Sequence, residues 1–471
     1  MAAVVALVMS SVACSNPTAV SDPVGPPESF APTPTIDDSV LSTTSTTGPV
    51  TTTTIDTQQT ALYRFDPRTL QTLPGSNPIP MGDYFWGSVS DNGTWLAGRA
   101  EQEDGNGGEL LLVDLAGWEV VARWPALSYV DPHVTDEGVV YHLGSGSTWP
   151  QLTRLTRGME SPGTAAELPA GFTPWNPIHQ HETMISIYGT LYGDDGGRET
   201  AMLVTVDLAN GAVTEIRVPQ VTIGAIEEVD IGEDWKPFIG AYPAVVWDQE
   251  RALIVHADQD VVTEVDLAGG GVTDHRFDVE ESVWGGLFSW LAAPALAGGM
   301  PTADSTRSAA LSPDGLRLYV ATRTGEAVFE SESDWYLLTR SVGLEVIDTR
   351  TWTRIDRLDA PIGEVALSPD GSTLLGRGFT QEDRLSTTSF VSHGVFVIEA
   401  STLDVLAHHE SPNEWYNPVS FSADGRFGYA GSWTKTNVLD LENGEVVGSR
   451  LGTQNQLWGE AGILTDSYLS R

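Results

Sequence analysis

From residue 61 onward, apolar and polar residues alternate in short runs, the pattern of strands that bury one face. One recurring pattern is a strand, a tight turn and a second strand, with its clearest copies at residues 310–320, 366–375 and 420–429. The turn sequence is Ser-Pro-Asp-Gly or Ser-Ala-Asp-Gly. Pro presets φ, Asp hydrogen-bonds the backbone ahead of it, and Gly takes a positive φ, so each copy predicts a hairpin. Looser copies lie at 89–95, 134–140 and 245–251.

A second pattern alternates with the first. It is an apolar alternating strand, an acidic residue, a short polar turn and another strand, as at residues 344–349 and 203–211. Further copies are centred on Asp66, Asp114, Asp266, Glu399 and Asp440, with a degenerate copy around Leu155. We interpret the recurring acid as a cap of the hairpin turn rather than as a metal ligand.

Short strands repeating at intervals of roughly forty to sixty residues predict an all-β fold, a single β-propeller with four-stranded antiparallel blades. The Ser-Pro-Asp-Gly turn at 312–315, followed by Leu318-Tyr319-Val320, and the run Val346-Ile347-Asp348-Thr349 resemble the YVTN-type propeller repeats. That family is related to WD-repeat and quinoprotein amine dehydrogenase-like propellers. The resemblance implies the fold and leaves function open, because such repeats occur in surface binding proteins and in enzymes.

The number of blades follows from the copies. Eight outer-strand copies and seven complete inner-strand copies favour eight blades, and seven is the alternative. The repeat region begins on an outer strand at 62–66 and ends on an apolar run at 462–469. We therefore expect the ring to close by pairing of N- and C-terminal strands, which leaves no exposed edge.

The first sixty residues predict export. Residues 2–13 are apolar but fall short of the roughly 20 residues that span a bilayer, and Cys14 follows directly. This segment resembles a bacterial lipoprotein signal, in which such a cysteine carries the lipid anchor. Residues 1–14 are then a signal peptide, 15–60 a disordered Thr/Ser/Pro-rich linker, and 61–471 the propeller. The alternative is ordinary signal cleavage and a soluble secreted protein.

Charge and cysteine content exclude several functions. The chain has 64 acidic and 24 basic residues and a net charge of −40, which would repel nucleic acid. Its single cysteine allows no internal disulfide and no CxxC site. We expect a monomer that touches the membrane only through its lipid anchor.

Aromatic residues precede most of the predicted inner strands, at the face where propellers commonly bind ligands. They lie near the central axis and would either wedge between blades or line a funnel for a ligand. These ligand-binding candidates are Trp86, Tyr129, Trp175, Tyr242, Trp415, Tyr416 and Trp458.

Metal and cofactor motifs are weak. His179 and His181 share one face of a predicted strand and are the only histidine pair with metal-like spacing. The acidic loops at 101–109 and 193–197 lack a calcium-loop arrangement. We predict no cofactor, since no motif supports calcium or a quinone. Residues 279–308 form an unusually apolar insertion, which we interpret as a cap over the core.

The sequence therefore favours an exported, lipid-anchored propeller that acts as a non-catalytic binding platform at the cell surface. Its partner would be a protein, a carbohydrate or a cationic small ligand. The alternative is a propeller enzyme of the quinoprotein-dehydrogenase or lactonase-like type, with a site at the central axis. The catalytic residues of such an enzyme cannot be assigned from this sequence.

The anchor is directly testable. If Cys14 carries the lipid, Cys14→Ala removes the only attachment point, and the protein should move from the membrane fraction to the medium. Immunoblots of the two fractions measure this shift. Unchanged membrane retention of the variant would contradict lipidation.

Overall fold

The computed structural model describes most of the chain between residues 60 and 451. The described residues are 60–62, 68, 79–82, 84–90, 93–101, 108–125, 132–145, 150–159, 163–174, 178–191, 200–228, 238–248, 250–277, 302–329, 335–384, 387–410, 416–422, 424–432 and 435–451. Within them every regular element is a β-strand, and none is a helix long and apolar enough to cross a membrane. The predicted signal peptide and nearly all of the predicted linker lie outside these residues.

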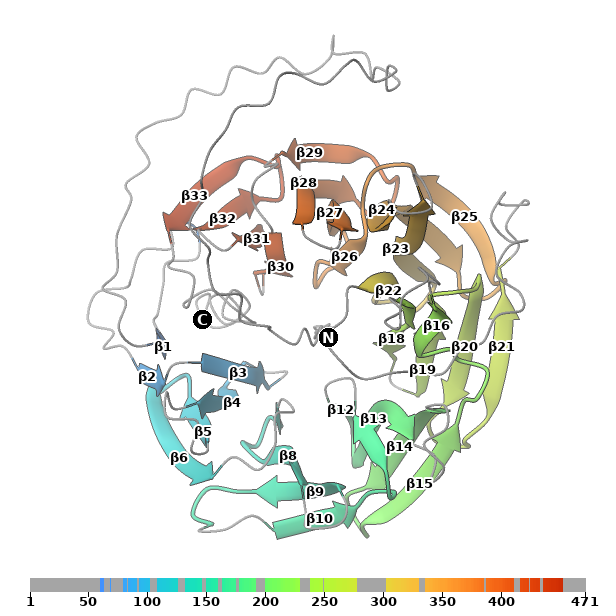
Figure 1. Ribbon diagram of the computed structural model, residues 1–471. Coiled ribbons are helices and arrows are strands. Elements are labelled where there is room, and N and C mark those ends of the chain that lie inside the picture. Colours follow the sequence, from blue (N-terminus) through green and yellow to red (C-terminus); the bar gives the residue numbers. More distant parts are fainter. Residues whose placement is uncertain are drawn as a thin grey trace, which may run out of the picture.

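Figure 1 shows the sheets standing side by side around a central axis, in the order of the chain, with β3, β12, β18, β22, β26 and β30 nearest the axis in their units. Most units have four antiparallel strands, as the repeats predict. The arrangement is therefore all-β and propeller-like.

The units in the first half of the described chain have short strands. They are β3–β6 (Tyr84–Val89, Trp95–Glu101, Glu109–Asp114, Glu119–Pro125), β7–β10 (His133–Val134, Val140–Ser145, Pro150–Leu155, Gly163–Glu167), β11–β15 (Phe172–Pro174, His179–His181, Met184–Leu191, Thr200–Asp207, Ala212–Arg217) and β18–β21 (Ala244–Trp247, Arg251–Val255, Val261–Asp266, Val272–Arg276).

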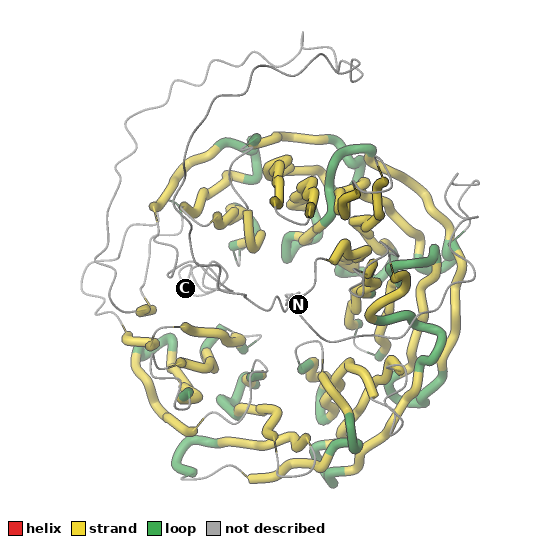
Figure 2. The backbone as a smooth tube through the Cα atoms, in the orientation of Figure 1, coloured by secondary structure: helices red, strands yellow, loops and turns green. Residues whose placement is uncertain are grey.

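The later units include much longer strands. They are β22–β25 (Thr302–Leu311, Arg317–Phe329, Trp335–Asp348, Thr353–Leu358), β26–β29 (Glu364–Leu367, Thr373–Arg384, Thr387–Glu399, Val405–His409) and β30–β33 (Tyr416–Phe421, Phe427–Ser432, Lys435–Asp440, Val446–Leu451). The tube in Figure 2 shows that strands make up most of each unit and that turns join them.

A two-stranded sheet, β1 (Thr60–Leu62) and β2 (Ile79–Gly82), lies between β33 and the β3–β6 unit in Figure 1. Ile79 packs against Leu96 and Leu111 of β3–β6. The predicted C-terminal partner strand, residues 462–469, lies outside the described residues, so ring closure and blade number stay predictions.

The predicted Ser-Pro-Asp-Gly turns are confirmed. Ser312 Oγ donates a hydrogen bond to Asp314 Oδ1 (2.5 Å) and accepts one from the backbone N–H of Arg317 (2.8 Å). Gly315 has φ +70°, where a side chain would be strained. Ser368 and Ser422 accept the corresponding backbone bonds at 2.9 and 2.7 Å. The serine therefore closes each turn from within.

The recurring acids cap the outer turns, as predicted. Each carboxylate accepts a hydrogen bond from the backbone N–H two residues ahead, as shown by Asp114, Asp207, Asp266, Asp348 and Asp440. At Asp348 the hydrogen bonds from the side chain and backbone of Arg350 lower the pKa to about 2. These acids are turn caps.

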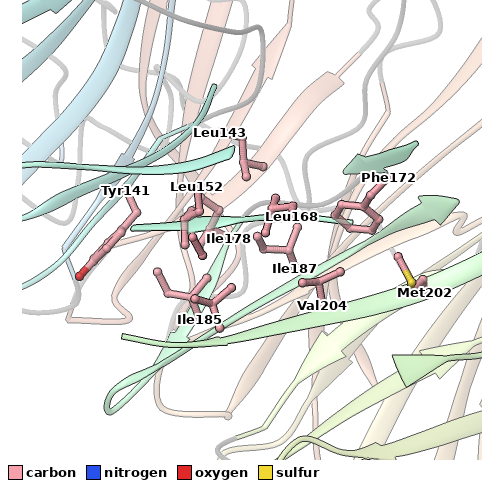
Figure 3. Close-up of a cluster of buried hydrophobic side chains, with 12 residues drawn as sticks. Tyr141, Leu143, Leu152, Leu168, Phe172, Ile178, Ile185, Ile187, Met202 and Val204 are labelled. Carbon is pink, nitrogen blue, oxygen red and sulfur yellow. The ribbon is translucent and has the colours of Figure 1, made fainter. Parts of the chain in front are cut away.

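The hydrophobic core is divided into layers between neighbouring units. In one layer, Tyr141 and Leu152 of β8–β9 face Ile185, Met202 and Val204 of β13–β14, as Figure 3 shows. Equivalent layers join every described pair of successive units. Middle strands such as β14 are buried along most of their length because alternate side chains enter the layers on opposite sides.

Four of the described outermost strands carry equivalent β-bulges. The register between the third and fourth strands shifts by one residue at the start of β6, β25, β29 and β33. Ile355 and Leu406 sit in two of these bulges and are 50% and 45% exposed. Bulges twist an edge strand away from straight pairing and so discourage edge-to-edge association.

Two hairpins extend beyond their own units. Residues 324–329 of β23 pair only with β24, and Leu337–Arg340 of β24 pair with Thr380–Asp383 of β27. A further hairpin, β16 (Gly224–Glu228) and β17 (Phe238–Tyr242), joins them because β17 pairs in parallel with the start of β22. One ten-stranded sheet thereby links the β22–β25 and β26–β29 units.

The sequence misplaced the end of one insertion. The predicted insertion runs to residue 308, but β22 already begins at Thr302. Residues 302–306 form a strand because they pair with β17, a contact that no local pattern indicates. The insertion thus ends before residue 302, and residues 279–301 lie outside the described residues.

A pair of buried tyrosines tests this core. Tyr188 is 1% exposed, burial raises its pKa, and its hydroxyl has no hydrogen-bond partner among the described residues. The Tyr319 hydroxyl donates to the Ala400 carbonyl at 3.0 Å. We expect Tyr188→Phe to raise the free energy of unfolding by about 1 kcal/mol and Tyr319→Phe to lower it by about 1 kcal/mol. Urea denaturation measures both, and a loss of stability in Tyr188→Phe would show that its hydroxyl has a partner.

Candidate functional site

The predicted aromatic funnel falls largely outside the described side chains. Trp86 lies in β3 and Tyr416 in β30, but their side chains are not described, and Tyr129, Trp175, Trp415 and Trp458 lie outside the described residues. Tyr242 ends β17, directly before β18, and is half-buried. The funnel therefore remains a prediction.

The histidine pair lies on β12, where His179 packs against the next unit. Its ring stacks on Trp247 with centroids 5.0 Å apart and planes 7° apart. Burial, reinforced by His133 and His181, lowers the pKa of His179 to about 4, so the ring is neutral at pH 7. Among the described residues, no three His, Cys, Asp or Glu side chains are placed to hold a metal ion. His179 and His181 are only weak metal candidates in the sequence, and the contact observed for His179 is one between units.

The described residues that stand out are charged groups on both faces of the β22–β23 hairpin. Thr306 is paired with Arg323, and the adjacent Arg307 is paired with Thr322. Because successive residues of a strand point to opposite faces, the two pairs face opposite neighbours. The first pair faces the β26–β29 unit, and the second faces the β18–β21 unit.

On the first face, two arginines converge on one carboxylate. Arg323 Nε donates to Thr306 Oγ1 at 2.7 Å, and its Nη1 lies 3.4 Å from Glu364 Oε1. Arg377 Nε donates to Glu364 Oε2 at 2.8 Å, and Nη2 of Arg377 also contacts Oε2. The side chains of Arg323 and Arg377 are only 5% and 8% exposed. The network joins β22, β23, β26 and β27 across two units.

The charge of Glu364 is held by its partners. Burial alone would raise its pKa, but Arg377 and Arg323 outweigh burial, and the net pKa lies below the ordinary value. The Arg323 guanidinium also lies over the Phe379 ring, 5.1 Å from its centroid. Glu364 is therefore ionised at neutral pH.

Glycines make this close approach sterically feasible. A Cβ on Gly363 would lie 2.4 Å from Arg323 Cγ, and one on Gly378 would lie 1.7 Å from the Pro361 carbonyl oxygen. Both distances are shorter than the contacts of real Cβ atoms, so neither position can carry a side chain unless its neighbour moves. Gly363, next to Glu364, and Gly378, next to Arg377, are thus required by the packing around the charges.

On the second face, Arg307 bridges to the β18–β21 unit. Its Nη1 donates to Thr322 Oγ1 at 2.6 Å, and its Nη2 donates to Asp260 Oδ1 at 2.9 Å. Nearby, Thr263 Oγ1 lies 2.8 Å from His256 Nε2 and donates to Asp274 Oδ1 at 2.7 Å. Ion pairs thus connect three successive units through one hairpin.

The sequence prediction missed these residues. Arg323 and Arg377 sit in strands whose other buried residues are mostly apolar, and such isolated basic residues, in a chain with 24 basic against 64 acidic residues, are the one signal that pointed to them. The partners lie far apart in sequence, so no local spacing connects them. Chemically, the arrangement fixes charges rigidly rather than offering a mobile acid or base.

Comparison with known proteins adds little beyond the general architecture. No protein family profile and no curated protein matches the chain. Among solved structures, the oligogalacturonate lyase of Vibrio parahaemolyticus is 11% identical, with 80% of this chain and 88% of that chain covered, at a TM-score of 0.43. The C-terminal WD40 domain of Sif2 is 10% identical, with 84% and 89% covered, at a TM-score of 0.45. Neither score reaches 0.5, so the propeller-like arrangement rests on the strand order and register of this chain.

The Arg323–Glu364–Arg377 network should be essential for stability. Glu364→Gln leaves two buried arginines without this carboxylate and should lower the free energy of unfolding by about 3–5 kcal/mol. The control is Glu109→Gln, which breaks the exposed pair with Arg123 (2.7 Å) and should cost at most about 1 kcal/mol. Equal losses in the two variants would contradict a special role for the network.

The same variant has a pH signature. The folded-state pKa of Glu364 lies below its ordinary value of 4.5, so the carboxylate stabilises fully above pH 4.5. That contribution is lost as the pH falls through the lower folded-state pKa. The difference in free energy of unfolding between wild type and Glu364→Gln should therefore shrink below pH 4.5. A difference that grows in acid would contradict a lowered pKa of Glu364.

Proposed function

We propose that the protein is an exported, lipid-anchored β-propeller that binds a ligand, without catalysis, at the face carrying the long hairpins. The observation that carries this proposal is the pairing of β24 with β27, which unites the β23–β24 and β27–β28 hairpins beyond the units they belong to. Four-stranded units need no such extension to pack against each other. An elaboration confined to one face of a regular scaffold favours a binding role for that face.

Strand direction supports the choice of face. Because β22 and β23 are antiparallel, the start of the innermost strand lies beside the point where β23 begins its extension, at the Thr306–Arg323 pair. Tyr242 lies two positions before β18, and Trp86 and Tyr416 lie in the first half of the innermost strands β3 and β30. We therefore propose that the aromatic candidates share the face of the long hairpins, where the aromatic groups would line the funnel and the hairpins would form its rim.

The hairpins offer apolar and aromatic contacts. Phe329, at the end of β23, is 54% exposed, and Val391 of β28 is 48% exposed. The Arg384 guanidinium lies 4.3 Å from the centroid of the Tyr336 ring. Exposed apolar groups beside polar ones suit a protein or carbohydrate partner, and the net charge of −40 favours a cationic one.

Ring closure belongs to this proposal. We propose eight blades, the first completed by the β1–β2 region together with residues from the C-terminal segment 462–469. The position of β1–β2 between β33 and the β3–β6 unit supports this (Figure 1). The lipid on Cys14 and the linker up to residue 60 would hold the ring away from the membrane.

Substitutions on the hairpins test the proposed binding face. The soluble Cys14→Ala chain should bind members of a glycan array or a peptide array, and Phe329→Ser combined with Val391→Ser should weaken that binding at least tenfold. The matched control, Ile355→Ser with Leu406→Ser, removes similarly exposed apolar groups from the outermost strands β25 and β29 and should leave binding intact. Mass spectrometry of the bound probe should find it unchanged. The absence of binding, equal loss in the control, or conversion of the probe would each contradict the proposal.

A further inference from the structure

The loop between β19 and β20 holds the arginine of the neighbouring unit. The backbone N–H of His256 donates to the Val261 carbonyl at 3.0 Å and closes the loop His256–Asp260. Arg307 reaches this loop from β22 and donates to Asp260 Oδ1 at 2.9 Å. The Arg307 side chain is 8% exposed and His256 is 2% exposed, so both groups are buried at the junction of the two units.

Hydrogen-bond donors and acceptors fix the tautomer of His256. The Asp274 carboxylate only accepts, so the single hydrogen of the Thr263 hydroxyl is used in the 2.7 Å bond to Asp274. Thr263 Oγ1 must then accept from His256 Nε2–H across 2.8 Å. Burial lowers the pKa of His256, against the influence of Asp258 and Asp274, and keeps the ring neutral. His256 Nδ1 is left as a buried acceptor with a free lone pair.

Three buried polar atoms around this loop have no hydrogen-bond partner among the described residues. They are His256 Nδ1, Asp258 Oδ1 and Arg307 Nε. Two are acceptors, and Arg307 Nε–H is a donor. Leaving each of them unsatisfied would cost about 1–3 kcal/mol, a large fraction of the stability of a protein. Native structures rarely leave such groups without a partner, which is often water.

We propose that His256 Nδ1, Asp258 Oδ1 and Arg307 Nε–H together bind the hydroxyl hydrogens and oxygen of one small neutral molecule. An oxygen of that molecule accepts from Arg307 Nε–H, and two O–H hydrogens donate, one to each acceptor. A water molecule has two hydrogens and satisfies all three atoms, and two adjacent hydroxyls of a polyol do the same. The O–H groups therefore come either from an internal water or from a polyol, and both molecules would make the same hydrogen bonds to the three atoms.

Other ligands fit these atoms poorly. An anion would face two acceptors and only one donor, and a cation would face the Arg307 guanidinium at close range. No three described His, Cys, Asp or Glu side chains are placed to hold a metal ion there. This proposal does not depend on the proposed function. The site lies between the β18–β21 and β22–β25 units, so it would exist whatever the face with the long hairpins binds.

A crystal structure of the Cys14→Ala chain, grown without polyols and then soaked in xylitol, tests the site. Without xylitol, we expect an oxygen within about 3.2 Å of at least two of the three atoms. If that oxygen stays after soaking, the hydroxyl is an internal water. If xylitol displaces it, the site binds polyols. Nitrogen NMR of the imidazole should also find the hydrogen on Nε2 of His256. An empty site, protein partners for all three atoms, or the Nδ1–H tautomer would overturn the proposal.

Variants separate the two sources in solution. Arg307→Lys keeps a positive charge for Asp260 but removes Nε–H, and Asp258→Ala removes one acceptor. If xylitol is the ligand, both variants should weaken its binding at least tenfold in calorimetry, while Arg123→Lys at an exposed pair should not. If water is the ligand, xylitol should bind neither the wild type nor any variant, and the crystallographic oxygen should disappear in Arg307→Lys. An oxygen that persists unchanged in Arg307→Lys would count against a role for Nε–H.

Discussion

Burial of apolar side chains between neighbouring units is the constraint on which the rest of the structure depends. Each described sheet is apolar on both faces, because successive residues of its middle strands enter different layers. In β13, Ile187 packs toward the β7–β10 unit and Tyr188 toward the β18–β21 unit. Burying one such side chain contributes about 1.5–3 kcal/mol, so a layer of ten contributes far more than any ion pair in the molecule. No unit can bury both of its faces alone, and the side-by-side arrangement of the described units follows from that need.

Polar groups then determine details that apolar burial leaves open. The Arg323–Glu364–Arg377 network crosses the junction between two units that the long hairpins also join. Replacing a whole buried ion pair by apolar groups can cost little stability, but leaving one of its charges unpaired is costly, so the pair requires the two units to align. The hairpins extend from the same end of these strands. A rigid base for an elaborated surface is what a binding face requires.

The sequence predicted local features and missed distant ones. The turns closed by Ser312, Ser368 and Ser422 and the cap at Asp348 depend on residues within five positions, so their chemistry is visible in the chain. The start of β22 was missed because Thr302–Thr306 is polar and becomes a strand only by pairing with β17, some sixty residues earlier. The same holds for the site. Arg323 and Glu364 meet through the packing of two units, and no spacing along the chain records that contact.

Native-state hydrogen exchange of the middle strands tests most directly whether the units depend on one another. The buried amides of β5, β14, β23 and β31 belong to separate units, and they exchange only when those strands open. If the units are stable only through shared layers, these amides should exchange with one common free energy of opening that changes equally with added denaturant. Distinct free energies, with one unit opening while its neighbours stay protected, would contradict this account.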